Sequence, residues 1–406
     1  MRLTTLLPLL SISLPITGTA AKPSAPPSRL WATHYNGNVY TLTLDKTTNN
    51  LSITDTQKTC GKMPSWLTFD TESQIVYCSD EDGTADPSTH GSLTAYHPDR
   101  EGKLHQLSSV KTVGGGVDSV IYEAGKEKLI AIAHYTASQE FHFKLTHPGA
   151  VAQQDSPHPH SVFLDPTGSF IVSPDLGADL LRIYSISSTT GKLTTCPPVN
   201  VTFGSGPRHG LFWTDGTDNN RTANGDNGVS HQREMAAVGK TMMYLANEIG
   251  GTVMVFDVSY ARSGCLDLQR TQTLVPYPAS GQKDHKLPTG ATPAEIRLIG
   301  DKFYVSVRSD QGFAPSDSMV TLDRSAKSGA VKVSGKSDAW GKVPRTFAVN
   351  RAGDLVAIGN QASANVAIVR RDRVSGELGE KVAVLQVGEP GKVGQAEGLS
   401  SVIWEE

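Results

Sequence analysis

One pattern of strands and turns recurs along most of the chain. A small-residue turn leads into an apolar strand, and then come a polar turn, a second strand and a turn of the form Gly-x-Leu. The clearest copy spans 159–186, and further copies begin at Pro64, Val117, Pro207, Pro293 and Pro344. A period of roughly 40 to 55 residues with about four short strands is typical of a propeller blade. The repeat therefore predicts an all-β fold, a seven-bladed β-propeller.

The copies divide the chain into blades. Blade 2 is predicted from Pro64 to about Val113, and the later blades begin at Gly116, Pro157, Pro207, Pro293 and Pro344. Polar stretches at 214–234 and 277–289 read as surface loops. The segment 30–34 resembles a second strand without a first, and 398–404 resembles a first strand without a second. Pairing of these N- and C-terminal segments would close the ring and remove its free sheet edges.

The N-terminal residues predict export. Residues 1–21 contain one early cation, a short apolar run and small residues at their end, which is the pattern of a signal peptide. Residues 22–28 read as a flexible lead-in, and 29–406 as a single propeller. The apolar run at 6–16 is too short to span a bilayer, so we expect a secreted, extracellular protein with no membrane partner.

Export makes the four cysteines a candidate disulfide set with three possible pairings. We favour Cys60–Cys78, which joins neighbouring blades, and then Cys196–Cys265. Three Asn-x-Ser/Thr sequons, at Asn50, Asn200 and Asn220, are candidate glycosylation sites.

The charge pattern limits the partners. The net charge is −3 and both signs are spread along the chain, so no basic stripe predicts nucleic acid binding. A closed ring leaves no sheet edge to pair, so a monomer is expected.

Standard catalytic strings are missing: the sequence has no G-x-S-x-G, no H-E-x-x-H, no P-loop and no C-x-x-C. The pair His158-x-His160 has no further clustered ligand, so neither a metal nor a cofactor is expected.

Strand geometry gives better candidates. In an antiparallel blade, the start of the first strand and the end of the second lie at one edge, near the central channel. The ionisable or amide residues at these places are Asp118, His160, Arg208, Glu295 and Arg345 at strand starts, and His34, Asp80, His134, Asp175, Glu248, Arg308 and Asn360 at strand ends. For each of them alone, a solvated or turn-capping role is at least as good an explanation.

Four of these residues fall in neighbouring blades: His160, Arg208, Glu248 and Arg308. Two guanidiniums facing one cavity suit a ligand with anionic groups. A histidine and a glutamate beside them can move protons at neutral pH. Asp175, Arg345 and His134 are the candidates for additional substrate contacts, although Arg–Glu pairing could also simply tie blades together.

The strings 157–162, 175–179, 206–209, 247–253 and 294–308 resemble the lactonase seven-bladed propeller family, which includes propeller-type 6-phosphogluconolactonase and carboxymuconate cyclase. The resemblance covers nearly the whole mature chain and is closest to secreted fungal members. It implies that His160, Glu248, Arg208 and Arg308 match the family's proposed active-site group. Two departures bear on the substrate: the long insertion after Arg208, and export, since the family's reactions are intracellular.

The leading hypothesis is a lactonase or lactone-forming cycloisomerase that acts on a small anionic molecule by acid/base catalysis. In cyclisation, arginines would hold carboxylates while His160 or Glu248 donates a proton; in hydrolysis, one of these two would activate water. The alternative is a non-catalytic secreted glycoprotein, an adhesin or antigen on a rigid platform. A third hypothesis is a binding protein for small anions, which would need no proton donor.

Overall fold

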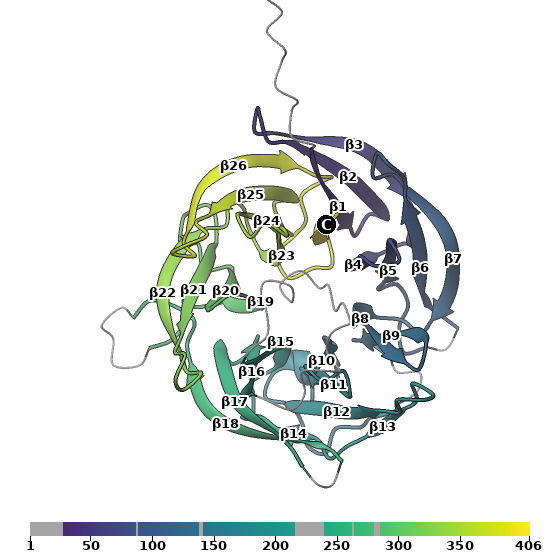
Figure 1. Ribbon diagram of the computed structural model, residues 1–406, viewed down its shortest axis with the longest axis vertical. Coiled ribbons are helices and arrows are strands. Elements are labelled where there is room, and N and C mark those ends of the chain that lie inside the picture. Colours follow the sequence, from purple (N-terminus) through teal and green to yellow (C-terminus); the bar gives the residue numbers. More distant parts are fainter. Residues whose placement is uncertain (1–26, 87, 138–140, 216–238, 262–263, 280–284) are drawn as a thin grey trace, which may run out of the picture.

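Short antiparallel strands build the whole described part of the chain. The computed structural model describes residues 27–406 apart from 87, 138–140, 216–238, 262–263 and 280–284. Within these ranges the only helix is a 3-10 turn, η1 (Ala152–Gln154), and none is long and apolar enough to cross a membrane. The strands form six sheets of four or five strands and one two-stranded sheet, arranged around a common centre (Figure 1). The fold is an all-β propeller, and we number its sheets as blades 1 to 7.

The first three blades use strands from both ends of the chain. From the centre outward they are β27 (Leu399–Trp404), β1 (Ser28–His34), β2 (Asn38–Asp45) and β3 (Asn50–Lys58) in blade 1; β4 (Pro64–Asp70), β5 (Ile75–Asp80), β6 (Gly91–Pro98) and β7 (Leu104–Thr112) in blade 2; β8 (Gly116–Ala124) and β9 (Glu127–His134) in blade 3.

The other blades follow in chain order. They are β10 (Phe163–Leu164), β11 (Phe170–Asp175), β12 (Leu180–Ile186), β13 (Leu193–Thr195) and β14 (Val199–Asn200) in blade 4; β15 (Pro207–Thr214), β16 (Thr241–Asn247), β17 (Thr252–Tyr260) and β18 (Leu266–Leu274) in blade 5; β19 (Thr292–Ile299), β20 (Lys302–Arg308), β21 (Ser318–Arg324) and β22 (Val331–Asp338) in blade 6; β23 (Pro344–Val349), β24 (Leu355–Asn360), β25 (Asn365–Arg371) and β26 (Leu378–Gln386) in blade 7.

The two ends of the described chain meet in blade 1. β27 pairs antiparallel with β1, with Leu30 opposite Trp404 and Ala32 opposite Val402. β27 also lies against β4 of blade 2 and β23 of blade 7. β1 begins at Ser28, one residue inside the predicted lead-in.

The core lies between neighbouring blades. Every residue of β4 is buried, whereas most of the outermost strand β7 is exposed, because inner strands are covered on both faces. One buried cluster joins Tyr244 of blade 5 to Phe303 of blade 6, with ring centroids 4.2 Å apart. Apolar packing of this kind supplies most of the stability of such a fold.

The recurring Gly-x-Leu turns have a structural explanation. In several blades an aromatic side chain donates a hydrogen bond to the turn glycine of the next blade: Trp31 to Gly102, Tyr122 to Gly191, Tyr244 to Gly329 and Tyr304 to Gly376. Gly329 and Gly376 have φ values of 76° and 73°, a backbone region that favours glycine. The repeat thus fixes both the turn and the contact between blades.

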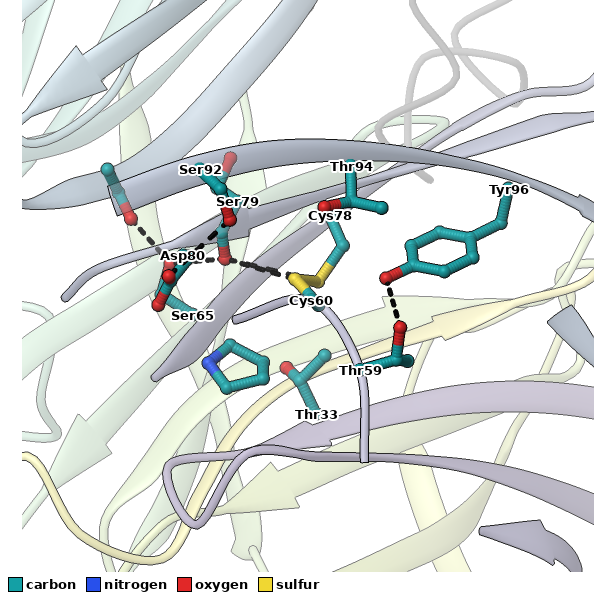
Figure 2. Close-up of a disulfide and its surroundings, with 12 residues drawn as sticks. Thr33, Thr59, Cys60, Ser65, Cys78, Ser79, Asp80, Ser92, Thr94 and Tyr96 are labelled. Carbon is teal, nitrogen blue, oxygen red and sulfur yellow. Dashed lines mark hydrogen bonds between the residues drawn. A yellow bond between two sulfur atoms is a disulfide. The ribbon is translucent and has the colours of Figure 1, made fainter. Parts of the chain in front are cut away.

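Both predicted disulfides are confirmed. Cys60 is bonded to Cys78, and Cys196 to Cys265. The first joins the chain between blades 1 and 2 to β5 and is buried beside Asp80 and Ser79, where Tyr96 and Thr59 share a hydrogen bond (Figure 2). The second joins blade 4 to blade 5.

Two predicted sequons lie on the surface: Asn50 begins β3 and Asn200 ends β14, and both are exposed. Asn220, the predicted signal peptide and nearly all of the predicted 214–234 loop lie outside the described residues.

Candidate functional site

The residue that directly follows the second strand of a blade occupies a repeated backbone position. Its N–H donates to the carbonyl of the residue just before the first strand, for example Glu248 to Gly206 (2.8 Å) and Glu81 to Met63 (2.9 Å). The same bond recurs in blades 1, 3 and 7, and in blade 4 the N–H of Leu176 donates to the carbonyl of His158, just before the isolated bridge between Pro159 and Asp175. We call these positions the tip residues: Tyr35, Glu81, Tyr135, Leu176, Glu248 and Gln361.

A second repeated feature is a β-bulge at the start of the inner strand. The register shifts between Pro207 and His209 and again between Pro344 and Thr346, which leaves Arg208 and Arg345 without a partner in the ladder. A bulge re-aims the side chain of the extra residue. Arg208 and Arg345 are therefore placed by the backbone, at the same edge as the tip residues.

Three predicted residues form one ion-pair chain. Glu248 Oε2 lies 2.8 Å from Arg208 Nε, and Glu248 Oε1 lies 2.7 Å from Arg308 Nη2. The Arg208 Nε–H is not aligned for a hydrogen bond to this carboxylate, so the first contact is an ion pair. Arg208 Nη1 donates to the Ala294 carbonyl at 2.7 Å, and Arg308 donates to Thr292 through Nε and Nη2. One carboxylate thus holds two guanidiniums.

The two guanidiniums of the ion-pair chain keep Glu248 charged. Burial by itself would raise its pKa, but Arg308 and Arg208 outweigh that effect and lower it. Burial lowers the pKa of Arg208 to about 9, and the repulsion of Arg308 adds to this. At neutral pH the three side chains of the ion-pair chain therefore carry two positive charges and one negative charge. This excess of positive charge favours an anionic ligand or a developing oxyanion.

His160 lies beside the ion-pair chain, among aromatic rings. Its ring centroid is 5.6 Å from that of Tyr135 and 5.2 Å from that of His209. The side chain is buried, and its Nδ1 has no hydrogen-bond partner among the described residues. Burial, and then the charge of Arg208, lowers its pKa well below the usual value. His160 is therefore a neutral imidazole with one buried ring nitrogen that has no described partner.

Two of the predicted strand-start residues are buried acids. Glu295 is 2% exposed, and its Oε2 lies 3.5 Å from both His209 Nδ1 and Arg297 Nη2. Asp118 is also buried and accepts hydrogen bonds from the N–H groups of Ser119 and Val162. Burial raises the pKa of Asp118 to about 8 and also raises that of Glu295. Asp118 and Glu295 are therefore buried and held by neighbouring groups, and we assign both a structural role in supporting the site.

Arg345 belongs to a further group, which the sequence analysis did not assemble. Its Cζ lies 5.7 Å from the centroid of the Tyr35 ring, and the Tyr35 hydroxyl donates to Glu81 Oε2 at 2.7 Å. Both Tyr35 and Glu81 are tip residues. Burial by itself would lower the pKa of Arg345, but Tyr35 and then the charges of Glu81, Glu248 and Glu295 raise it.

Two predicted substrate contacts are placed differently. Asp175 is fully buried; Oδ1 accepts from the N–H groups of His158 and Ala178, and Oδ2 accepts from Arg182. These contacts occupy both oxygens, so we reassign Asp175 to the support of blade 4. His134 Nδ1 lies 3.3 Å from the Gly114 carbonyl, and no described contact joins it to the ion-pair chain.

The comparisons with known proteins decide the family. The profile described as "Lactonase, 7-bladed beta-propeller" matches residues 29–394. This chain belongs to that family. A protein of Arthroderma benhamiae named "Probable 6-phosphogluconolactonase" is 26% identical over 374 residues, covering 87% of this chain and 84% of its own. A 6-phosphogluconolactonase of Formosa agariphila is 25% identical and covers 71% of this chain and 77% of its own.

A solved structure shares the fold. The periplasmic gluconolactonase PpgL of Pseudomonas aeruginosa superposes with a TM-score of 0.65 at 23% identity, covering 93% of this chain and 99% of its own. At that identity the likeness concerns the fold alone.

Proposed function

We propose that the protein hydrolyses lactones that carry an anionic group. The observation that carries this proposal is the ion-pair chain Arg208–Glu248–Arg308 beside a neutral His160 with an unpartnered ring nitrogen. The names of the relatives from Arthroderma benhamiae and Formosa agariphila support the same reaction class.

In this scheme the arginines bind and stabilise negative charge on the substrate. Arg208 or Arg308 would hold the substrate anion and stabilise the oxyanion that forms when water attacks the lactone carbonyl. Glu248 would act as their counter-ion and fix their positions. The unpartnered Nδ1 of His160 would hydrogen-bond the attacking water or the substrate. Side chains and water carry every step.

The protonation states favour hydrolysis over cyclisation. A cycloisomerase must deliver a proton to carbon from a group that is protonated at the working pH. His160 is neutral because its pKa is lowered, and Glu248 is ionised because its pKa is lowered as well. Neither is a ready donor at neutral pH, and so the cyclase variant of the hypothesis loses support.

We also propose that the protein is exported from the cell. We further propose that blade 1, which contains strands from both ends of the chain, closes the ring. The two disulfides support an oxidising compartment, in agreement with the pattern of residues 1–21. The pairing of β27 with β1 supports closure of the ring.

Turnover of a small lactone panel by purified protein tests the function. The panel contains glucono-δ-lactone, its 6-phosphate and carboxymuconolactone, and the variant is His160→Ala/Arg308→Ala. Arg373→Ala, at an exposed position in the turn after β25, is the matched control. We expect turnover in wild type and control and its loss in the double variant. A folded wild type inactive on the whole panel would favour the non-catalytic or anion-binding hypothesis.

A further inference from the structure

Lactone hydrolysis needs a group that takes a proton from water, and neither His160 nor Glu248 is well suited. Both oxygens of Glu248 lie against guanidiniums, which weakens the carboxylate as a base. His160 is buried and its pKa is lowered, so it too is a weak base. The tip residues include a second carboxylate, Glu81. No ion pair between Glu81 and a guanidinium is found among the described residues.

Glu81 is held in place through its main chain and one of its carboxylate oxygens. Its N–H donates to the Met63 carbonyl, the bond that anchors every tip residue. Its Oε2 accepts from the Tyr35 hydroxyl at 2.7 Å. No hydrogen bond or ion pair to Oε1 is found in the part of the chain that the structure describes, and the side chain is half-buried. One oxygen is therefore oriented while the other remains available to water.

Tyr35 connects Glu81 to the positive side of the site. Its ring lies between the Glu81 carboxylate and Arg345, whose Cζ is 5.7 Å from the ring centroid. Burial raises the pKa of Tyr35 above its usual range, while Arg345 and Arg208 act in the opposite direction. The phenol thus stays protonated and donates to Glu81. Tyr35 and Glu81 are both tip residues, so this pair lies at the same edge of the ring as the tip residue Glu248.

We propose that Glu81 is the general base of the hydrolysis, that Tyr35 orients it, and that Glu248 only positions the two arginines. This assignment rests on the proposed lactonase function. It names a catalytic residue in blade 2, on the other side of the site from Glu248.

The step balances with water as the co-reactant. Glu81 Oε1 takes a proton from water while the water oxygen bonds to the lactone carbonyl carbon. The acyl carbon–oxygen bond then breaks, and its electron pair moves to the ring oxygen. The proton passes from Glu81 to that alkoxide, which gives the hydroxy acid and restores the carboxylate.

The test compares two glutamine variants on the best substrate of the panel. Glu81→Gln keeps the shape and an acceptor for Tyr35, and we expect kcat to fall at least about 100-fold with KM nearly unchanged. Glu248→Gln should instead raise KM, because the arginines lose their positions. Tyr35→Phe should lower kcat about 10-fold without changing KM, which a purely structural role would not produce.

Chemical rescue separates a lost base from a disturbed fold. Formate should restore part of kcat in Glu81→Ala but none in Glu248→Ala, and Arg373→Ala serves as the unchanged control. Full kcat in a folded Glu81→Gln, beside an active wild type, would overturn the assignment of Glu81 alone. A folded wild type without turnover would overturn the lactonase proposal together with it.

Discussion

Glu248→Gln should destabilise the fold by removing the charge between two guanidiniums. Arg208 is 1% exposed, and its pKa is lowered from 12.5 to about 9 even with Glu248 in place. That lowering corresponds to about 5 kcal/mol of unfavourable free energy for the charged form. Glu248 is the acid paired with it, so the neutral amide leaves this buried cation without its ion-pair partner.

The expected loss of unfolding free energy is about 2 to 4 kcal/mol. Breaking a buried ion pair costs about 3 to 5 kcal/mol, and the 21% exposure of the Glu248 side chain reduces this through solvent screening. Urea unfolding of wild type and variant measures the difference. The matched control is Glu397→Gln, whose pair with Lys392 is exposed and should contribute less than about 1 kcal/mol.

Inorganic phosphate provides a second measurement on the same variant. An anion can take the place of the missing carboxylate, so phosphate should raise the melting temperature of Glu248→Gln more than that of wild type. If the variant loses less than about 1 kcal/mol, or if phosphate stabilises both proteins equally, the view of Glu248 as the counter-ion of Arg208 is wrong.

Three further perturbations follow from the structure. Burial raises the pKa of Asp118 from 3.8 to about 8, so its contribution to stability is fully present below about pH 4 and is lost as pH rises through 8. Asp118→Asn should remove about 6 kcal/mol of this pH dependence, and urea unfolding free energies that change equally with pH in both proteins at pH 5, 7 and 9 would contradict this. Replacing Cys196 and Cys265 by serine opens a loop with a sequence separation of 69 and should cost about 4 kcal/mol in unfolding free energy; calorimetry showing an unchanged melting temperature would refute it. Deleting 399–406 removes β27, the neighbour of β1, β4 and β23, and should abolish soluble expression; a folded monomer by circular dichroism would disprove closure through blade 1.

The sequence predicted the strand starts well because each begins a repeated turn. β4, β8, β15 and β23 begin at the predicted residues, and β19 begins one residue earlier, at Thr292. Blade 4 is the exception, because its first strand β10 begins at Phe163 and not at the predicted Pro157. The predicted strand ends were also right: a strand ends at His34, Asp80, His134, Asp175, Arg308 and Asn360. In blades 1 and 2, however, the residue that belongs to the site follows the strand end by one position. Asp80 and His34 bind main-chain groups at the strand end, while their successors Glu81 and Tyr35 belong to the site.

The offset of one residue between the strand end and the site residue has a physical cause. Ladder residues and tip residues differ by one position, and the bulge that brings Arg208 and Arg345 to the same edge changes the register by one residue. Side chains alternate between faces in a strand, so counting strand residues without the bulge selects the wrong neighbour. Glu248 was found because it already lay one past the end of β16. The Tyr35–Glu81 bond joins two blades and leaves no local sequence signal.

The anchor shared by the tip residues is made entirely by the main chain. Its strength does not depend on the side chain, and this chain fills the position with tyrosine, glutamate, leucine and glutamine. Chemistry at the mouth of the ring can therefore be exchanged one blade at a time by single substitutions, while the scaffold beneath stays as it is. Of the tip residues that the proposed reaction does not use, Leu176 and Gln361 are buried and Tyr135 is half-buried. Tyr135 is therefore the place from which natural or laboratory evolution could start toward a new substrate.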